Sequence, residues 1–375
     1  MINRQTGMRE GIRRWAGAVV VGVALVALVA PMPAPLVERV YSNGVYPFIE
    51  RALTTASGVV PVAWLDIWLG GALGWLGWVW WQPVRVSHGS RVRAVGRAAW
   101  RTVVGAAAVY LIFLLCWGLN YRREPLSARL VQDKPVPDTA AVQALGELAV
   151  RELTALHDAA HAREWPGPAV DDARLRAAAA HVQSLLATPR VAVARLKPTL
   201  LRWVFRWEGV DAMTNPFGLD VLRNPDLLPF ERPFVAAHEW AHLAGFADEA
   251  EANFIGWLTC LHGDVRAQYS GWLFLYWQVE AELPPAERAS VAARVPPGVK
   301  ADRDAIAARL TAGVVPVLQQ AGWAAYDRYL KANRVESGVH SYGEVLTLIS
   351  RTALDSRWRP VLRSGDAAAA EASGP

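Results

Sequence analysis

Residues 233–254 read PFVAAHEWAHLAGFADEAEANF and contain the strongest motif of the chain, HExxH. On a helix, His238 and His242 stand four residues apart on one face, so both imidazoles can bind a single metal ion. Glu239 lies between them and is placed to act as general base on a water molecule that the metal activates. Zinc suits imidazole ligands and keeps an open position in catalytic sites, so the motif predicts a catalytic Zn²⁺ site.

The burial expected for this helix supports a metal site over a surface pair of histidines. The residues that flank the motif from Ala236 to Ala244 carry no charge apart from the motif itself. A solvent-facing histidine pair is the alternative interpretation. It would leave two imidazoles and a carboxylate among apolar neighbours without a partner, which is costly.

The third metal ligand must come from the polar residues after the motif. Gly245 can end the helix in a left-handed conformation, and Asp248 is a good N-cap for the next helix, with Glu251 completing a capping box. Glu249 then has no structural role, so we expect it to be the third ligand. Asn253, one turn further along, is expected to orient a zinc histidine. Asp248 is the alternative ligand, because HExxHxxGxxD copies the spacing of zinc sites whose helix turns at glycine.

The chain after residue 121 predicts one predominantly helical domain. Helical patterns cover residues 139–164, 170–187, 232–244, 249–262, 268–283, 301–332 and 341–354. Two short segments, 201–206 and 217–222, are typical of strands. The expected fold is mainly α, with a zincin-like HExxH domain and a small β-sheet over residues 122–366. A disordered, low-complexity tail is expected over residues 367–375.

Three long runs with almost no charge precede this domain, at about residues 15–37, 58–81 and 102–120. Each can supply the roughly 20 apolar residues that span a bilayer as a helix. Tryptophans near the ends of the runs are typical of a membrane interface. We therefore expect residues 1–121 to form a membrane anchor with three transmembrane helices in the lipid bilayer. A cleaved signal peptide is the alternative for the first run, although no clean cleavage site follows it.

The arginines indicate which way the chain crosses the membrane. Residues 1–123 hold 13 arginines and four acidic residues, a net charge of +9, whereas the remainder has a net charge of −4. The N-terminal tail and residues 82–101 are rich in arginine, and the positive-inside rule places both in the cytoplasm. Three spans then put the domain outside the cytoplasm. Because that domain is mildly acidic, no nucleic-acid partner is expected.

Residues 233–254 resemble an uncharacterised family of bacterial membrane proteins, the domain of unknown function 3810. The resemblance extends to Trp117–Tyr121, Tyr269–Gly271 and Tyr329–Tyr342, and so covers most of the chain. It implies a multi-pass protein of the bacterial inner membrane, with three spans and an extracytoplasmic HExxH domain. More distantly, Glu249-x-x-x-Asn253 is similar to the gluzincin zinc peptidases, in which Glu-x-x-x-Asp supplies the third zinc ligand. Asparagine in place of the aspartate leaves that position uncharged here.

The expected function is that of a membrane-anchored zinc metallopeptidase, which hydrolyses peptide bonds of a peptide or protein substrate in the cell envelope. Glu239 would act as general base and then as proton donor. Such a site also needs a donor for the oxyanion, and the resembling segments offer Tyr269, His340 and Tyr342. A catalytically silent zincin-like domain, acting as an envelope sensor or scaffold, is the alternative.

A second pair of histidines has the same spacing. His157 and His161 also stand four residues apart in a helical pattern. A second metal site is one interpretation of this pair. Charged neighbours surround both residues, so we expect a solvated helix face instead.

Overall fold

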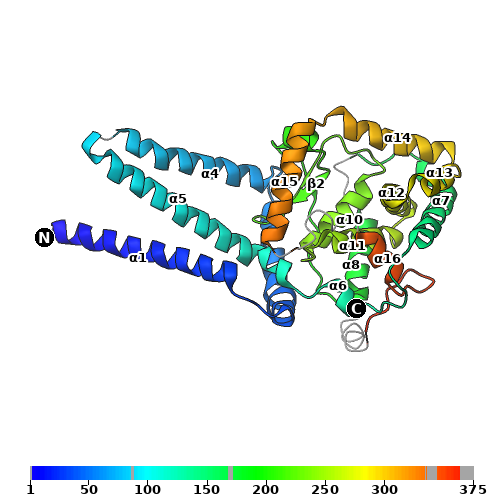
Figure 1. Cartoon of the computed structure of the whole chain (residues 1–375), viewed down its shortest axis with the longest axis horizontal. Helices are drawn as coiled ribbons and strands as arrows, with labels where there is room; N and C mark the ends of the chain where they lie inside the picture. Colours follow the sequence, from blue (N-terminus) through cyan, green and yellow to red (C-terminus); the bar gives the residue numbers. More distant parts are fainter. Residues whose placement is uncertain (1, 86–87, 168–171, 334, 336–343, 364–375) are drawn as a thin grey trace.

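The computed structural model describes residues 2–85, 88–167, 172–333, 335 and 344–363 of the 375-residue chain. Three long helices project from one end of the molecule, and a mainly helical domain forms the other end (Figure 1). The domain contains a small three-stranded sheet. The expected mainly α fold with a small sheet is confirmed. The tail at 367–375, for which disorder was expected, lies outside the described residues.

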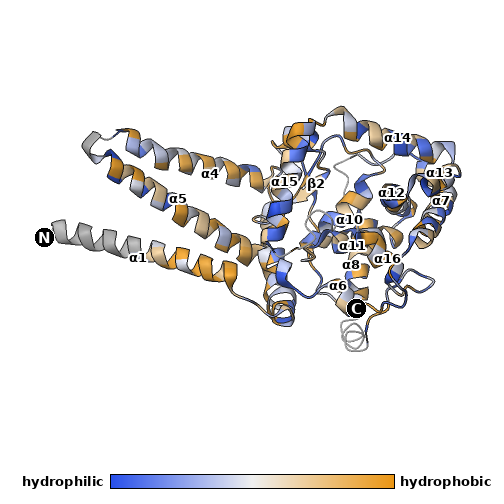
Figure 2. Cartoon of the chain, viewed as in Figure 1, coloured by the Kyte–Doolittle hydropathy of each residue, from blue (hydrophilic) through white to orange (hydrophobic). Residues whose placement is uncertain are grey.

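The projecting helices are α1 (Ile2–Val29), α4 (Trp64–Trp81) and α5 (His88–Cys116), and α5 contacts both of the others. The N-terminus and the turn between α4 and α5 lie at the end away from the domain (Figure 1). Apolar residues predominate along the described parts of these helices (Figure 2), and many of their large side chains, such as those of Leu73 and Trp78, are exposed. An apolar surface of this extent marks a site of contact with lipid or protein.

The number of candidate membrane spans is smaller than the three expected. Among the described residues, Ser90–Cys116 is the one helix that is long and apolar enough to cross a membrane by itself. Trp15–Val29 qualifies only together with Ala34–Gly58, from which it is bent by 117°. The first expected span is interrupted because Pro31 and Pro33 precede this bend. Helix α4 does not qualify as a candidate span. Six of its 18 residues are tryptophan and four are glycine, which lowers its mean hydropathy.

A bent helical segment links α1 to α4 and packs on the domain. It comprises α2 (Ala34–Leu36), the π-helical η1 (Val37–Val45) and α3 (Tyr46–Gly58). Its buried side is polar: Glu38 pairs with Arg123 at 2.7 Å, and the Tyr46 hydroxyl donates to the Leu243 carbonyl at 2.8 Å. Its outer side exposes apolar residues such as Phe48. This segment lies within the membrane anchor expected at residues 1–121, and its buried side chains Val37, Tyr41 and Tyr46 join the core of the domain.

Four helices form the centre of the domain. They are α7 (Thr139–His161), α10 (Arg232–Leu243), α11 (Glu249–Leu261) and α12 (Val265–Glu282). Helices α10, α11 and α12 contact one another, and α7 packs against α12. Every residue of α11 is buried, and Trp257 on α11 packs edge to face against Trp272 on α12 at 5.8 Å. The surrounding helices are η3 (Gly118–Arg122), α6 (Leu126–Arg129), α8 (Ala173–Leu185), α9 (Arg202–Glu208), α13 (Pro285–Ala292), α14 (Pro297–Ala312), α15 (Pro316–Ala332) and α16 (Glu344–Arg351). Helix η2 (Gln82–Arg85) follows α4 in the projecting part and contacts α4 and α5.

The sheet has the strand order β1-β3-β2 and lies beside α10. Its strands are β1 (Leu196–Lys197), β2 (Ala212–Thr214) and β3 (Val221–Arg223). Strand β3 runs parallel to β1 and antiparallel to β2, which pairs Thr214 with Val221. The strand expected at 201–206 is wrong, because this segment forms α9. A short apolar run does not distinguish helix from strand, and Gly209, at φ +73°, ends the helix.

One long helix expected at 301–332 is two helices in the structure. Helix α14 ends at Ala312, and Pro316 begins α15. Proline has no N–H to donate inside a helix, but it is favoured at the first helical position. The chain therefore turns between Ala312 and Pro316. The turn matters for the site, because α15 then lies across the domain beside the projecting helices (Figure 1).

Candidate metal centre

Three side chains from α10 and α11 converge on one point. The Nε2 atoms of His238 and His242 lie 3.1 Å apart, and Oε2 of Glu249 lies 3.4 and 3.6 Å from them. In a tetrahedral zinc site with bonds of about 2.0–2.1 Å, neighbouring ligand atoms lie about 3.3–3.4 Å apart. The triangle of ligand atoms therefore has the size that zinc requires, and these three residues can hold a metal ion.

The turn between the two helices brings Glu249 back onto α10. Gly245 has a left-handed conformation, with φ +83°, and ends α10 as expected. Asp248 then caps α11, with Oδ1 accepting the N–H of Ala250 at 2.9 Å and of Glu251 at 3.1 Å. Glu249 is consequently the first residue of α11. The local sequence signals of glycine and N-cap thus determine the position of the third candidate ligand.

A close approach of the two helices completes the arrangement. A Cβ atom added to Gly256 on α11 would lie 3.0 Å from the backbone nitrogen and Cα of His238. Any larger residue at this position would push α11 away from the histidine. Glycine here allows the carboxylate of Glu249 to reach both imidazoles.

The charged groups of the cluster are buried and stabilise one another. Oε2 of Glu249 is buried and forms no hydrogen bond. Burial alone would raise the pKa of Glu249, but His242 and His238 hold it well below its usual range. Burial likewise opposes protonation of His242, yet Glu249 outweighs this effect and raises the pKa of His242 to about 9. A buried carboxylate oxygen that faces two imidazoles without a hydrogen bond is the donor set that a divalent cation satisfies.

Further contacts orient the candidate ligands. Nδ1 of His242 lies 2.7 Å from the Phe246 carbonyl oxygen, so the ring donates from Nδ1. In the neutral ring, Nε2 is then the nitrogen that can bind a metal ion. The Tyr326 hydroxyl donates to Oε1 of Glu249 at 2.5 Å. This bond leaves Oε2 as the carboxylate oxygen that faces the histidines.

Glu239 lies beside the cluster on the side of the sheet. Its Oε2 accepts a hydrogen bond from the Thr214 hydroxyl at 2.6 Å, and Thr214 is the last residue of β2. Glu239 is 4% exposed. Burial raises the pKa of its carboxyl above the usual value, against the opposing effect of His238 and His242. A carboxyl group in this position can accept a proton and pass it on.

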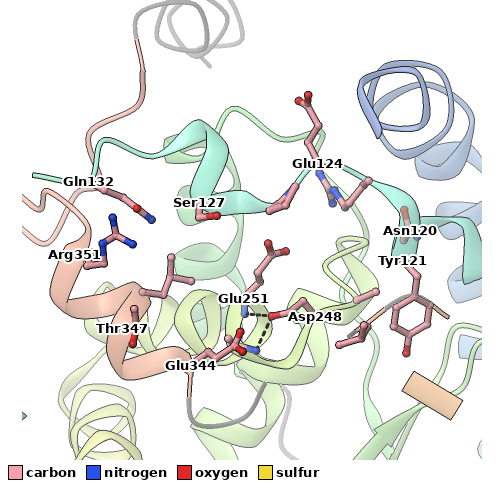
Figure 3. A pocket seen from close by; sticks show the side chains of 16 residues that line it. Asn120, Tyr121, Glu124, Ser127, Gln132, Asp248, Glu251, Glu344, Thr347 and Arg351 are labelled. Atoms are coloured by element: carbon pink, nitrogen blue, oxygen red, sulfur yellow. Dashed lines mark hydrogen bonds between the residues drawn. The ribbon is translucent and has the colours of Figure 1, made fainter. Parts of the chain in front are cut away.

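Two acidic residues that follow the motif line a cavity. A cavity of about 720 Å³ is lined by Asp248 and Glu251, together with Glu344 and Arg351 (Figure 3). Glu251 accepts a hydrogen bond from the Leu126 N–H at 2.5 Å, so the expected capping box does not form. The N-cap role predicted for Asp248 is confirmed, and Asp248 is not a member of the metal-binding group.

The other residues expected at the site do not all lie near it. Asn253 is 3% exposed, and its Nδ2 atom is buried without a hydrogen-bond partner, as is Nδ1 of His238. No hydrogen bond joins Asn253 to either histidine of the motif. The Tyr269 hydroxyl donates to Asp302 at 2.5 Å, which places it in a different cluster. His340 and Tyr342 lie outside the described residues.

Three residues at the site were not expected there from the sequence. Thr214 holds Glu239, Tyr326 holds Glu249, and Trp117 donates from Nε1 to the His242 carbonyl at 3.0 Å. Trp117 belongs to the segment that carried the family resemblance, which was the only signal for it. Thr214 and Tyr326 reach the site over long sequence separations, without a local motif.

The second histidine pair also meets an acidic residue. His157, His161 and Asp302 form the other group that can hold a metal among the described residues. The two rings are stacked, with centroids 4.5 Å apart, and Nε2 of His161 lies 3.2 Å from Oδ2 of Asp302. These side chains are partly exposed, in contrast to the buried group on α10 and α11.

Comparison with known proteins gives a family and no further relative. Residues 41–350 match the family model described as protein of unknown function (DUF3810). No curated protein and no solved structure matches the chain. The matched residues include both helices of the candidate metal centre and the aromatic residues Trp117 and Tyr326. Since the match spans most of the chain, the protein belongs to the DUF3810 family.

Proposed function

We propose that the protein is a zinc-dependent metallopeptidase, anchored in the bacterial inner membrane, that hydrolyses peptide bonds outside the cytoplasm. The observation that carries this proposal is the triangle of ligand atoms from His238, His242 and Glu249, whose sides of 3.1–3.6 Å fit zinc. The carboxyl group of Glu239 next to this triangle supplies the acid–base group that peptide hydrolysis requires.

In the proposed mechanism, His238, His242 and Glu249 hold the zinc ion. When bound, zinc supplies a Lewis acid that polarises the substrate carbonyl and lowers the pKa of water. Glu239 takes a proton from the attacking water and delivers it to the amide nitrogen that leaves. The Thr214 hydroxyl fixes one oxygen of Glu239 at 2.6 Å, which keeps the carboxylate oriented for both transfers.

Tyr326 is the described residue best suited to stabilise the oxyanion. Its hydroxyl lies at the cluster, 2.5 Å from Oε1 of Glu249, and a small side-chain movement would turn it toward a substrate carbonyl. Tyr269 is less suited because its hydroxyl donates to Asp302, which belongs to the other histidine cluster. His340 and Tyr342 stay candidates from the sequence.

The proposed topology has three membrane-crossing helices, α1, α4 and α5. Helix α4 has modest hydropathy, but it lies alongside α5 and exposes apolar side chains, so we propose that it crosses with the other two. The N-terminus and the α4–α5 turn lie at the same end of the molecule (Figure 1), and both stretches are rich in arginine. The positive-inside rule then assigns that end to the cytoplasm and the domain to the opposite side.

One observation favours a catalytically silent protein as the second candidate. The side chains of His238, His242 and Glu249 are only 14%, 10% and 4% exposed, so a substrate has little access to the site in this conformation. A buried zinc ion could then serve a structural role in an envelope sensor or scaffold.

The test compares the purified full chain with its Glu239→Gln variant on a library of unstructured peptides. Zinc content is measured in parallel on both proteins. The enzyme proposal expects one zinc ion per chain in both and cleavage by the wild type alone. Equal zinc with no difference in cleavage would support the silent alternative, and absence of zinc from both would overturn both candidates.

A further inference from the structure

A second cavity lies on the opposite face of the helix that carries the HExxH motif. It has a volume of about 930 Å³ and is lined by Pro233, Ala236 and Trp240 of α10. These three residues share one face of the helix, whereas His238 and His242 occupy the other. The cavity is therefore separate from the candidate metal centre, although both are built on α10.

The lining of this cavity is strongly basic. Six arginines and one lysine line it, against three aspartates among the described residues. All three aspartates have structural partners: Asp172 and Asp264 cap α8 and α12, and Asp220 accepts a hydrogen bond from the Trp64 N–H at 2.9 Å. The lysine, Lys197, lies 3.5 Å from Asp220. Asp264 also lies 3.8 Å from Arg174. Among the described residues, none of the three aspartates forms an ion pair with Arg223, Arg232 or Arg266.

Arg223 is the clearest case of an uncompensated charge. Among the described residues it has no hydrogen-bond or ion-pair partner, and its Nε atom is buried. Burial lowers the pKa of Arg223, which reports the cost of holding this charge away from water. An unpartnered, half-buried guanidinium group destabilises the fold unless an anion occupies the space beside it.

Two further arginines bond only to backbone carbonyls. Arg232 donates to Leu227 at 3.0 Å and to Pro166 at 3.1 Å. Arg266 donates to the carbonyls of residues 163 and 164. Burial, followed by the positive charge of Arg223, lowers the pKa of Arg232. Glu231 partly offsets the charge of Arg232, and the guanidinium of Arg266 lies 5.4 Å from the centroid of the Trp165 ring. Neither arginine forms an ion pair among the described residues, so both can also bind an anionic ligand.

We propose that this cavity binds the phosphate group of an anionic ligand through Arg223, Arg232 and Arg266. Several guanidinium groups around one space favour a compact anion with several acceptor oxygens, which each planar fork can bind through two N–H groups. The indole of Trp240 and two prolines, Pro229 and Pro233, give the same cavity an apolar wall, which suits a ligand that also has an apolar part.

The position of the cavity indicates two sources for this phosphate. The C-terminal end of α3, from Thr54 to Gly58, lines the cavity, and the chain enters the projecting helix α4 at Trp64. Val59, next to this wall, is 80% exposed. In the proposed topology this is the level of lipid headgroups, so an anionic phospholipid is one source. A free phosphate compound is the other, and it does not depend on that topology.

Binding is tested on the purified full chain in a neutral detergent. Short-chain phosphatidylglycerol, short-chain phosphatidylcholine and inorganic phosphate are titrated at constant ionic strength, and the dissociation constant is measured from the shift in melting temperature. Saturable binding of phosphatidylglycerol in preference to phosphatidylcholine supports the lipid source. Saturable binding of inorganic phosphate alone supports the free compound.

The variant Arg223→Gln/Arg232→Gln should weaken binding of the preferred ligand at least tenfold. The matched control Arg288→Gln/Arg294→Gln removes the same charge from exposed positions around α13 and should change it less than twofold. Arg223→Gln alone should melt at or above the temperature of the ligand-free wild type, because it removes a charge without a partner. No saturable binding, equal binding by both double variants, or a lower melting temperature of Arg223→Gln would overturn the proposal.

Discussion

Two clusters in this protein have the same composition: a pair of histidines four residues apart and an acidic residue from another helix. In the cluster on α10 and α11, the imidazole planes of His238 and His242 are at 88° and their Nε2 atoms face each other at 3.1 Å. Glu249 then lies within 3.6 Å of both nitrogen atoms. All three ligand atoms therefore face one common point.

The cluster on α7 and α14 lacks this convergence. The rings of His157 and His161 are nearly parallel, at 24°, and Asp302 approaches His161 while accepting a hydrogen bond from Tyr269. The histidine side chains here are 23% and 29% exposed. A spacing of four residues places two imidazoles on one face of a helix. Whether they can bind one metal ion together depends on their burial and on an acidic ligand that faces both of them.

The largest difference between the clusters should appear in zinc binding. Glu249→Ala removes the acidic ligand that faces both imidazoles, so we expect zinc affinity to fall by more than about 100-fold. Asp302→Ala removes the corresponding residue of the other cluster and should leave one zinc ion per chain. The measurement is zinc content after dialysis against a weak chelator. Loss of zinc from Asp302→Ala would reverse the assignment of the two clusters.

The next effect concerns peptide hydrolysis. Glu239→Gln keeps the size of the side chain but removes its ability to take a proton, so turnover should fall by about 10²–10⁴-fold. Zinc content should stay at the wild-type value, because Glu239 is not one of the three ligands. Asp158→Asn, which follows His157 as Glu239 follows His238, is the matched control and should not change turnover. A Glu239→Gln variant with undiminished turnover would remove Glu239 from the mechanism.

A smaller effect is expected at the tyrosines that hold the acidic residues. Tyr326→Phe removes the hydrogen bond to Glu249, and zinc affinity should fall by about tenfold, the lower end of the range for residues that orient a metal ligand. Tyr269→Phe removes the equivalent bond to Asp302 and should leave zinc affinity unchanged. Both variants are compared by competition with a chromophoric zinc chelator. Equal affinities would mean that Tyr326 does not orient Glu249.

The smallest effect is expected from the pair between His161 and Asp302. Because it is partly exposed, His161→Gln should lower the free energy of unfolding by less than about 1 kcal/mol, with zinc content unchanged. Denaturant unfolding of the zinc-free protein provides the measurement. A loss of several kcal/mol, or a dependence of the melting temperature on added metal that this variant abolishes, would indicate that the second cluster is a metal site too.

Much of the candidate metal centre could be predicted from local sequence. The spacing of His238 and His242, the left-handed Gly245 and the N-cap Asp248 each depend on neighbours within a few residues, and together they indicated Glu249. Tyr326 and Thr214 could not be predicted in this way, because they lie 77 and 25 residues from their partners. Such contacts depend on how helices and strands pack, for which the sequence offers no local pattern.

The segment between α1 and α4 has a sequence pattern that indicates its buried side. Its buried polar residues recur every four positions: Glu38, Ser42, Tyr46, Glu50 and Thr54. This spacing places them on one side of a helical segment, opposite apolar residues such as Phe48. A polar side of this kind is typical of a helix that turns its polar face to protein and its apolar face outward. Residues 38–57 have a net charge of zero, which does not reveal this pattern.

Anomalous X-ray diffraction at the zinc absorption edge tests the central claim most directly. Crystals of the full chain grown with equimolar zinc should show one strong peak within bonding distance of Nε2 of His238, Nε2 of His242 and a carboxylate oxygen of Glu249, with no peak at the cluster of His157, His161 and Asp302. A peak at the second cluster with none at the first, or no zinc at either, would contradict the assignment of α10 and α11 as the metal centre.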